Sequence, residues 1–341
     1  MRILTTLFFS FCACVLFAAP QITLNQAYLA DADAIVGIDF TGITEDHFLV
    51  KLCKQANDQV LAEAGVDSTE KFDFDLMKNA KGILTLKVRN IVDEKREFDP
   101  AKDFEMAGVF VYQNSIEELT RKQFNACKNA KKAPADVTLA MGESKYLDLP
   151  CFDVAITDED GKTMSLRYIL SADGKNIILG TKDAVNANII SAGAIPAALA
   201  EIQKSMPAKA NLYIALPITE KIRSAAKEEF ADEEDASVAS EIDKLKFVGL
   251  AATCNTPNTI ALKLVVGTVS ADAAAGLGVQ AQGFLPMIQM MGGDDPSLAW
   301  LKTVTMAVEG NNIVINASIT EAQLNALIAD LSADNEMPIN E

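Results

Sequence analysis

The sequence is poor in the residues on which most catalytic and metal sites depend. It contains one histidine, His47, among 341 residues, and this excludes a metal site built from several histidines. The motifs Gly-x-Ser-x-Gly, His-Glu-x-x-His, Cys-x-x-Cys and the Walker phosphate-binding loop do not occur in it. We therefore predict a non-enzyme with no catalytic, metal-binding or cofactor-binding residues. His47 follows Glu45 and Asp46 in a predicted first helical turn, where we expect a solvated position.

Basic residues are also scarce. The chain has 30 lysines and arginines against 47 aspartates and glutamates, a formal net charge of −17. A surface of this sign repels nucleic acids and anionic lipid headgroups, and it favours solubility or contact with cations. We expect no nucleic-acid partner and at most weak cation binding to the acidic surface. The densest acidic run, residues 228–235, lacks the spacing and the turn glycine of a calcium loop, so we expect a solvated helix face or loop there.

Long hydrophobic runs are confined to the N-terminus. Met1-Arg2 precedes an apolar run at residues 3–19, a pattern typical of a secretory signal peptide. No later segment approaches the ~18 consecutive apolar residues that a membrane span requires. We predict a signal peptide at residues 1–19 and export to the periplasm or the cell exterior. Two alternatives keep the protein at the membrane: an uncleaved N-terminal anchor, and a lipoprotein attached through Cys14.

Four cysteines remain after the predicted leader: Cys53, Cys127, Cys151 and Cys254. In an oxidising compartment an even number permits disulfides, here with three full connectivities. The alternative is that all four are buried free thiols, which pack as small hydrophobic side chains. No two of them have the spacing of metal ligands.

Half of the residues are hydrophobic, which is enough for a folded core, and their spacing alternates between strand and helix periods. Turn residues such as Asp160-Gly161 and Asp173-Gly174 separate short strands. Ser115, Thr219, Ser270 and Thr320 are the predicted N-caps of helices. The predicted strands lie at 34–40, 84–88, 106–112, in three pieces within 152–181, and at 212–216, 247–254, 260–267, 301–308 and 312–317. The predicted helices lie at 44–64, from 115, at 181–191 and 197–204, from 219, from 270 and at 321–331.

This order of elements repeats. Each half is predicted to run strand, helix, hairpin, helix, hairpin, helix, and short phrases recur: residues 174–179 resemble residues 310–315. Strands joined by short turns favour antiparallel pairing, with helices on one face. The predicted fold is therefore α+β, with two similar tandem units at 20–205 and 206–332 and a polar tail at 333–341. The alternative is one large α+β domain whose similar phrases reflect common turn residues.

Two stretches near the C-terminus contain residues that also occur in binding sites. Gly276, Gly278 and Ala281 imitate a dinucleotide fingerprint, but they fall inside a predicted helix and not at a strand-to-helix turn, so we expect them to permit tight helix packing. The second stretch is rich in methionine, which adapts to irregular apolar surfaces. An apolar groove is one hypothesis for it, and core packing is the other. The candidate groove residues are Leu285, Met287, Met290, Met291 and Trp300.

These observations predict an exported, non-catalytic α+β protein of the cell envelope or exterior with a binding or structural role. The ligand, the protein partner and the oligomeric state stay open at this point. The first alternative is a periplasmic carrier of an apolar ligand. The second is a hydrolase that works through carboxylates alone, which requires two buried acids at a suitable separation.

Overall fold

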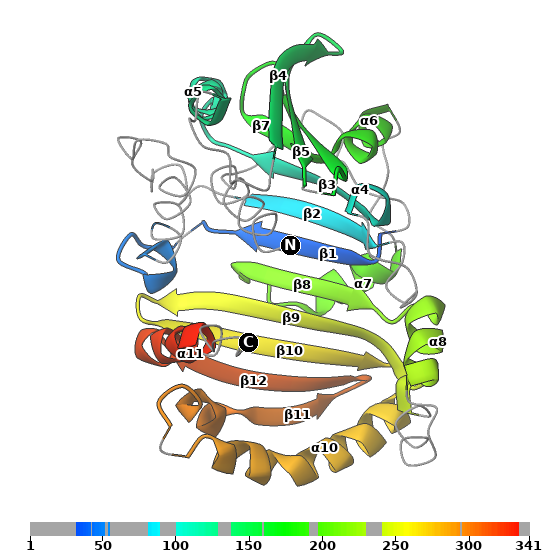
Figure 1. Ribbon diagram of the computed structural model, residues 1–341. Helices are drawn as coiled ribbons and strands as arrows, with labels where there is room; N and C mark the ends of the chain where they lie inside the picture. Colours follow the sequence, from blue (N-terminus) through cyan, green and yellow to red (C-terminus); the bar gives the residue numbers. More distant parts are fainter. Residues whose placement is uncertain are drawn as a thin grey trace, which may run out of the picture. The chain divides into compact units, whose positions relative to one another are not determined.

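The computed structural model describes residues 32–41, 43–51, 54, 81–88, 100–128, 138–158, 160–190, 197–229, 241–293 and 295–333. The predicted leader and almost all of the predicted tail lie outside these ranges. The chain divides into two compact units, Met1–Ala197 and Ala198–Glu341, and each is described here by itself (Figure 1). This division lies shortly before the predicted boundary between residues 205 and 206.

The described elements of the first unit follow the predicted order, with one added strand, β4, and one added short helix, α4; most of the predicted helix at 44–64 lies outside the described residues. They are β1 (Ala34–Asp39), β2 (Lys81–Val88), α4 (Pro100–Asp103), β3 (Phe104–Val111), α5 (Glu117–Lys128), β4 (Thr138–Tyr146), β5 (Leu149–Thr157), β6 (Thr163–Leu170), β7 (Asn176–Thr181) and α6 (Lys182–Ile190).

The described part of the second unit contains as many elements but fewer strands. Its elements are α7 (Ala197–Ser205), which starts at the boundary, then β8 (Leu212–Pro217), α8 (Glu220–Glu229), β9 (Leu245–Thr256), β10 (Thr259–Thr268), α10 (Ala271–Met291), the 3₁₀ turn η1 (Ala299–Thr303), β11 (Thr305–Glu309), β12 (Asn312–Thr320) and α11 (Glu321–Ala333).

The first unit is built on an antiparallel sheet with the strand order β1-β2-β3-β7-β6-β5-β4. Its centre is fully enclosed: all residues of β7 and the last six of β3, Met106–Val111, are buried. Both faces of the central strands β3 and β7 are therefore covered. The continuous apolar sequences of β3 and β7 have the composition expected of such strands.

Strand β4 was not predicted. It pairs with β5 through a two-residue turn in which Leu147 and Asp148 have φ angles of 51° and 62°. Such a turn normally carries Asn or Gly, because both central residues need positive φ. The sequence lacks that turn chemistry at this point, and the hairpin therefore escaped recognition.

The prediction that helices cover one face of the sheet is wrong for the first unit. Phe124 of α5 packs on Phe152 of β5, with ring centroids 5.0 Å apart. Asn186 of α6 bonds to Arg167, which pairs across the strands with Asp153, the residue next to Phe152. Because neighbouring strand residues point to opposite faces, α5 and α6 cover opposite sides of β5 and β6 (Figure 1). The strands supply apolar side chains in both directions, which one layer of helices does not bury.

The second unit has an antiparallel sheet with the order β8-β9-β10-β12-β11. Helix α10 packs along β10, β11 and β12. Gly278 lies so close to β11 that a Cβ there would be 2.4 Å from Val308 Cγ2. The glycine phrase that imitates a dinucleotide fingerprint thus serves close packing of helix on strand at Gly278, as predicted. Gly276 has open space instead.

Three of the predicted helix caps are observed in the second unit. The hydroxyls of Thr219, Ser270 and Thr320 each accept a hydrogen bond from the backbone N–H three residues further on. The prediction of a strand at 301–308 is wrong in its first part. Residues Ala299–Thr303 form the 3₁₀ helix η1, and only Thr305–Glu309 is strand. Packing of η1 against α10 and β12 outweighs the strand propensity of this segment. The α+β character of the chain is confirmed.

Candidate functional site

The most notable polar arrangement of the described residues lies on one cross-strand row of the first unit. The register places Gly142 of β4, Asp153 of β5, Arg167 of β6 and Gly180 of β7 side by side. Glycine flanks the charged pair on both sides. At Gly180 a Cβ would lie 2.1 Å from the backbone oxygen of Met106, so only glycine lets β3 and β7 approach this closely.

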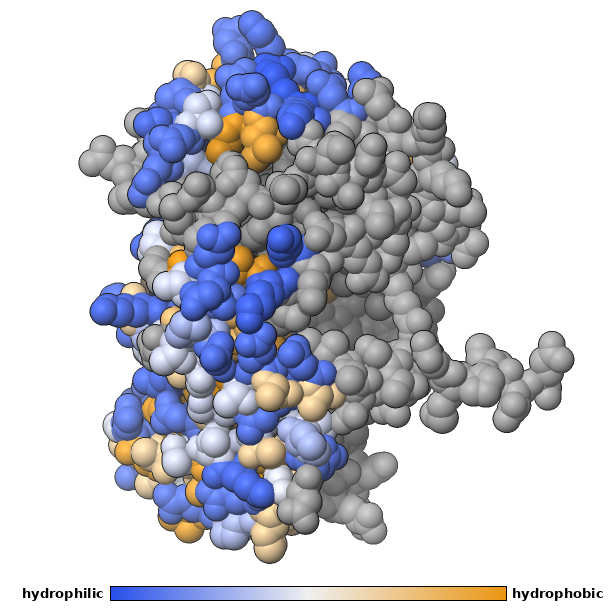
Figure 2. Space-filling view, turned by 90° about the vertical axis from the view of Figure 1, so that its left-hand side faces the viewer, coloured by the Kyte–Doolittle hydropathy of each residue, from blue (hydrophilic) through white to orange (hydrophobic). Residues whose placement is uncertain are grey.

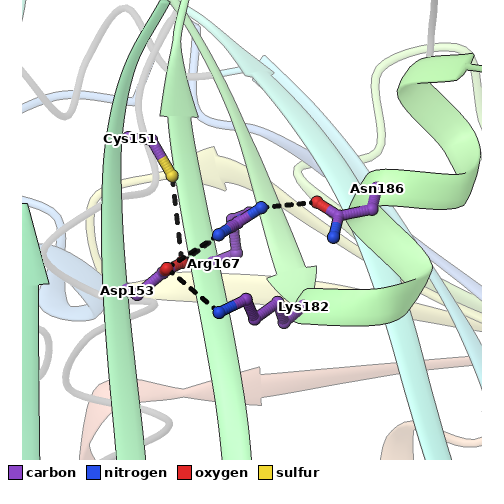
Figure 3. Close-up of polar contacts among 5 residues, drawn as sticks. All are labelled: Cys151, Asp153, Arg167, Lys182 and Asn186. Atoms are coloured by element: carbon purple, nitrogen blue, oxygen red, sulfur yellow. Dashed lines mark hydrogen bonds and ion pairs between the residues drawn. The ribbon is translucent and has the colours of Figure 1, made fainter. Parts of the chain in front are cut away.

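Arg167 is held by three short hydrogen bonds (Figure 3). Its Nε donates to Asp153 Oδ1 and its Nη2 to Asp153 Oδ2, both at 2.7 Å, which is a bidentate pair. Its Nη1 donates to Asn186 Oδ1, also at 2.7 Å. The guanidinium carbon lies 5.0 Å from the ring centroid of Tyr146. These contacts fix the position and the charge of the guanidinium.

The environment favours the ionised form of both partners. Arg167 is only 7% exposed, yet its hydrogen bond to Asp153 raises the pKa of the guanidinium despite burial. Burial acts to raise the pKa of Asp153, but the hydrogen bonds and charges of Arg167 and Lys182 outweigh it and lower that pKa. Lys182 Nζ lies 3.3 Å from Asp153 Oδ2. Asp153 is therefore a stable carboxylate that accepts from two cations.

Cys151 lies two residues before Asp153 on the same face of β5. It is a fully buried free thiol with Sγ 3.8 Å from Asp153 Oδ1. Burial is the largest influence and raises the pKa of this thiol above its ordinary value, and the nearby carboxylate acts in the same direction. Since the thiolate is the nucleophilic form, Cys151 is not activated for covalent chemistry.

A hollow of about 300 Å³ adjoins this cluster. Its floor consists of small residues on β4, β5 and β6. The carboxylate of Asp153 and the side chain of Lys182 lie beside it. The small residues are Ala140, Gly142, Ala155 and Ser165. Ala140 and Gly142 are exposed on the edge strand β4, so the hollow is shallow and open, with an apolar surface next to charged groups.

The structure places the predicted site residues in different parts of the molecule. Cys151 belongs to the cluster, whereas Cys254 lies in β9 of the second unit, where its N–H donates to Asn211 Oδ1. The side chains of Cys53 and Cys127 lie outside the described residues, so disulfide pairing stays a prediction. The expectation that His47 is solvated is wrong. His47 is buried, its ring centroid lies 5.0 Å from that of Phe48, and its Nδ1 accepts a hydrogen bond from the N–H of Leu49.

The five candidate groove residues lie in and after α10. Met287, Met290 and Met291 are 50%, 73% and 58% exposed, on the side of α10 that faces away from the sheet, while Leu285 and Trp300 are half-buried. The methionines therefore form an exposed apolar helix face. Whether this face binds an apolar ligand stays a prediction.

Sequence reasoning missed Asp153, Arg167 and Lys182. A usable indication existed, because Asp153 and Arg167 each stand within apolar strand sequences, FDVAI and SLRYIL. A charged residue inside a buried strand normally has an oppositely charged partner. Two such residues in strands joined by a tight turn point to a pair with each other.

Other kinds of site are not found in the described residues. They contain no group of three or more His, Cys, Asp or Glu side chains that is suited to a metal ion. Most of the acidic run at 228–235 lies outside the described ranges. None of the helices that the structure describes has the length and apolar character of a membrane span. On the face shown in Figure 2, hydrophilic residues predominate and hydrophobic ones form small separate areas.

Comparison of the chain with models of protein families, with characterised proteins and with solved structures finds no match. The functional argument therefore depends on the residues and their geometry alone.

Proposed function

We propose that this is an exported, non-catalytic α+β protein of the cell envelope or exterior that acts by binding. The apolar N-terminal run after Met1-Arg2 supports export. The acidic composition supports a partner other than nucleic acid. The hollow beside Asp153 and Lys182 supports a binding role, because its floor of small residues adjoins these two charged groups.

The main support for a non-catalytic role is that the charged groups of the cluster are already paired with one another. Asp153 accepts from Arg167 and Lys182, and its pKa is lowered. A carboxyl that serves as general acid needs a raised pKa instead. Cys151 is held as a neutral thiol. The cluster thus offers neither an acid nor a nucleophile, and the carboxylate-dependent hydrolase ranks behind the binding functions.

We also propose that the two units are tandem versions of one α+β arrangement. The strand orders support this. In the first unit β1, β2 and β3 are followed across the sheet by β7 and β6, and in the second unit β8, β9 and β10 are followed by β12 and β11. The hairpin of β4 and β5 is the addition that distinguishes the first unit.

A carrier of an apolar ligand is the second candidate function. Two features favour it: the small apolar floor of the hollow and the exposed methionines of α10. Native mass spectrometry of protein recovered from the exported fraction, compared with a denatured sample, tests it directly. A bound mass that is lost on denaturation favours the carrier and gives the ligand class.

The non-catalytic proposal is tested by screening the purified protein for hydrolysis of glycoside and ester substrates. We expect no turnover above that of a mock purification. Turnover that disappears in Asp153→Asn but persists in Asp160→Asn, an exposed turn aspartate, would overturn the proposal. The same recovered protein tests export, because a mass shortened by the leader is expected. A full-length chain in the cytosolic fraction argues against export.

A further inference from the structure

Helix α10 presents an apolar face to solvent. Asp272, in its first turn, is the only charged residue among its 21. Several of the large apolar side chains that are exposed in the described part of the chain lie on this one helix, 50–73% exposed: Val279, Phe284, Met287, Met290 and Met291. The solvent side of a helix normally carries charged and polar residues. The composition of α10 therefore indicates that this side contacts something other than water.

Two glycines of the exposed side are not needed for packing against the described residues. Gly278, on the sheet side, makes room for Val308. A Cβ at Gly276 or Gly283, in contrast, would meet nothing within 4 Å. Glycine is the least favourable residue of a helix interior after proline, and alanine would fit at both positions. Close approach of another chain to this side of the helix is a reason for glycine at both.

The exposed glycines and the large apolar residues share one row. Steps of three and four residues place them on one side of the helix, opposite the buried Ala274 and Gly278. The members of this row are Gly276, Val279, Gly283, Met287 and Met290. Gly283 is its midpoint, seven residues from Gly276 and Met290 and four from Val279 and Met287.

The row is complementary to itself when two copies run antiparallel. With Gly283 of one helix against Gly283 of the other, each Met290 meets the Gly276 of the second copy, and each Met287 meets its Val279. Large side chains then meet smaller ones at both ends, and the two glycines meet at the centre, which is the fit that helix packing requires. A parallel pair would place Met290 against Met290 and Gly276 against Gly276.

We propose that the row from Gly276 to Met290 is a dimer interface, in which the α10 helices of two copies of this chain pack antiparallel about a two-fold axis at Gly283. Each contact then occurs twice, as in any interface with two-fold symmetry. This inference goes beyond the proposed binding function and does not depend on the hollow beside Asp153.

Charge and shape favour a second copy over other occupants. Two chains with a net charge of −17 repel each other, and on this row they approach without bringing like charges together. A helix that binds a membrane surface is typically rich in lysine and arginine on its polar side, and α10 contains neither. Small-molecule sites are concave, whereas the exposed side of a helix is convex.

The size of the row sets the strength of the dimer. A helix of 21 residues is about 30 Å long and ~10 Å wide. Two such helices bury less than the ~1,600 Å² of a standard interface. We therefore expect a weak dimer, with a dissociation constant of roughly 10–100 µM.

Sedimentation equilibrium of the full chain without its leader, from about 1 to 500 µM, tests the dimer. Met290→Glu places two carboxylates in the interface and is expected to raise the dissociation constant at least about tenfold. Its urea unfolding is expected to be unchanged, because Met290 is exposed. The matched control is Leu147→Glu: Leu147 is 65% exposed on the β4–β5 turn, and this variant is expected to dimerise as the wild type does.

Gly283→Ala separates an interface role from a structural one. Alanine favours the helix, so the monomer is expected to resist urea slightly better. The dimer is expected to weaken by roughly tenfold, because two added methyl groups meet at the axis.

Cysteine variants test the orientation of the two helices. Antiparallel packing brings the two thiols of Gly283→Cys together and holds those of Gly276→Cys about 20 Å apart. With oxidised glutathione, Gly283→Cys is therefore expected to form a disulfide-linked dimer beyond what the wild type forms, and Gly276→Cys is not.

A chain that stays monomeric up to ~500 µM, or a dimer as strong in Met290→Glu as in the wild type, would overturn the inference. Cross-linking of Gly276→Cys and Gly283→Cys alike would overturn the antiparallel arrangement. Binding of the monomer to phosphatidylcholine vesicles, or to a co-purified apolar ligand, that Met290→Glu abolishes would assign this face to a membrane or to the carrier function and overturn the dimer. These outcomes leave the tests of export and of turnover unaffected.

Discussion

Among the described residues, Arg167 of the first unit is buried and Arg223 of the second is half-buried, and the two arginines have different partners. In the first unit, Arg167 meets a carboxylate and an amide from side chains of β5 and α6. In the second unit, Arg223 of α8 donates to the backbone oxygens of Ile242 and Leu245, at 2.8 and 2.5 Å. Every residue has a backbone carbonyl, so the partners of Arg223 do not depend on the side chains at 242 and 245. The contacts of Arg167 instead need particular residues at three positions, 153, 167 and 186.

This difference separates a structural arginine from one that belongs to a site. Arg223 joins α8 to the segment that leads into β9, and besides the two carbonyls it lies 3.8 Å from the exposed carboxylate of Glu220, one helix turn away. Arg167 organises Asp153, and through it Lys182, next to a hollow. The hollow also depends on β4 and β5, the hairpin for which the second unit has no equivalent strands in its described sheet.

The largest expected effect comes from removing these two arginines. Arg167→Met leaves the partly buried carboxylate of Asp153 without its bidentate partner, and we expect a loss of about 3 kcal/mol in the free energy of unfolding of the first unit. Arg223→Met leaves neutral carbonyls and is expected to destabilise the second unit by roughly 1–2 kcal/mol. Hydrogen exchange read by mass spectrometry resolves β5 and β6 from β8 and β9.

The double variant Asp153→Asn with Arg167→Met controls for the charge. If the unpaired carboxylate causes the loss, the double variant is more stable than Arg167→Met alone. Equal losses of unfolding free energy in Arg167→Met and Arg223→Met would show that the carboxylate partner of Arg167 makes no difference.

Close backbone contacts supply the second comparison. A Cβ at Gly180 would lie 2.1 Å from the backbone oxygen of Met106, and a Cβ at Gly249 would lie 2.3 Å from the terminal methyl of Met206. The distances are similar, but a paired backbone does not move aside, while the end of a methionine does. We expect Gly180→Ala to cost roughly 3 kcal/mol and Gly249→Ala about 1 kcal/mol, measured by the same exchange experiment. Similar costs would show that Met206 is as immobile as the backbone.

Sequence reasoning predicted much of the fold because the helices and most strands carry local information. The caps at Thr219, Ser270 and Thr320 and the turn glycines at Gly161 and Gly174 mark element ends whatever the tertiary contacts are. The helix at α10 was predicted correctly, and so was the packing role of Gly278.

The candidate site was not predicted, because its information is not local. Asp153 and Arg167 come together through the register of β5 and β6, and Lys182 joins them only when the sheet closes with β7 and α6. The hollow is defined by small residues, which carry no chemical pattern in a sequence. His47 was misplaced for a similar reason: its acidic neighbours suggested solvent, but its side chain turns inward against Phe48.

One titratable group in each unit is expected to give a response at a different end of the pH range. The folded-state pKa of Asp153 is lowered, so its contribution to the first unit is present above the ordinary carboxyl pKa of about 4 and is lost as the pH falls below it. Burial raises the pKa of Tyr213 in the second unit to about 12, although a hydrogen bond from Gln203 opposes this. Its contribution is present below pH ~10 and is lost as the pH rises toward 12.

Hydrogen exchange of each unit against pH measures both effects. Asp153→Asn is expected to flatten the acid dependence of the first unit and to leave the second unchanged, and Tyr213→Phe is expected to flatten the alkaline dependence of the second. A pH dependence that survives both substitutions would assign it to other groups.

The smallest expected effects distinguish two hairpin turns. The β4–β5 turn holds Leu147 and Asp148 at φ angles of 51° and 62°, whereas the β11–β12 turn uses Gly310 at 60°. A side chain in this conformation is unfavourable by roughly 1–2 kcal/mol, part of which glycine returns through its greater freedom in the unfolded chain. We therefore expect Asp148→Gly to stabilise the first unit by up to about 1 kcal/mol and Gly310→Ala to destabilise the second by about 1 kcal/mol, in urea unfolding followed by exchange. A loss of stability in Asp148→Gly would mean that the aspartate side chain itself supports the turn, and the added hairpin would then depend on this residue rather than tolerate it.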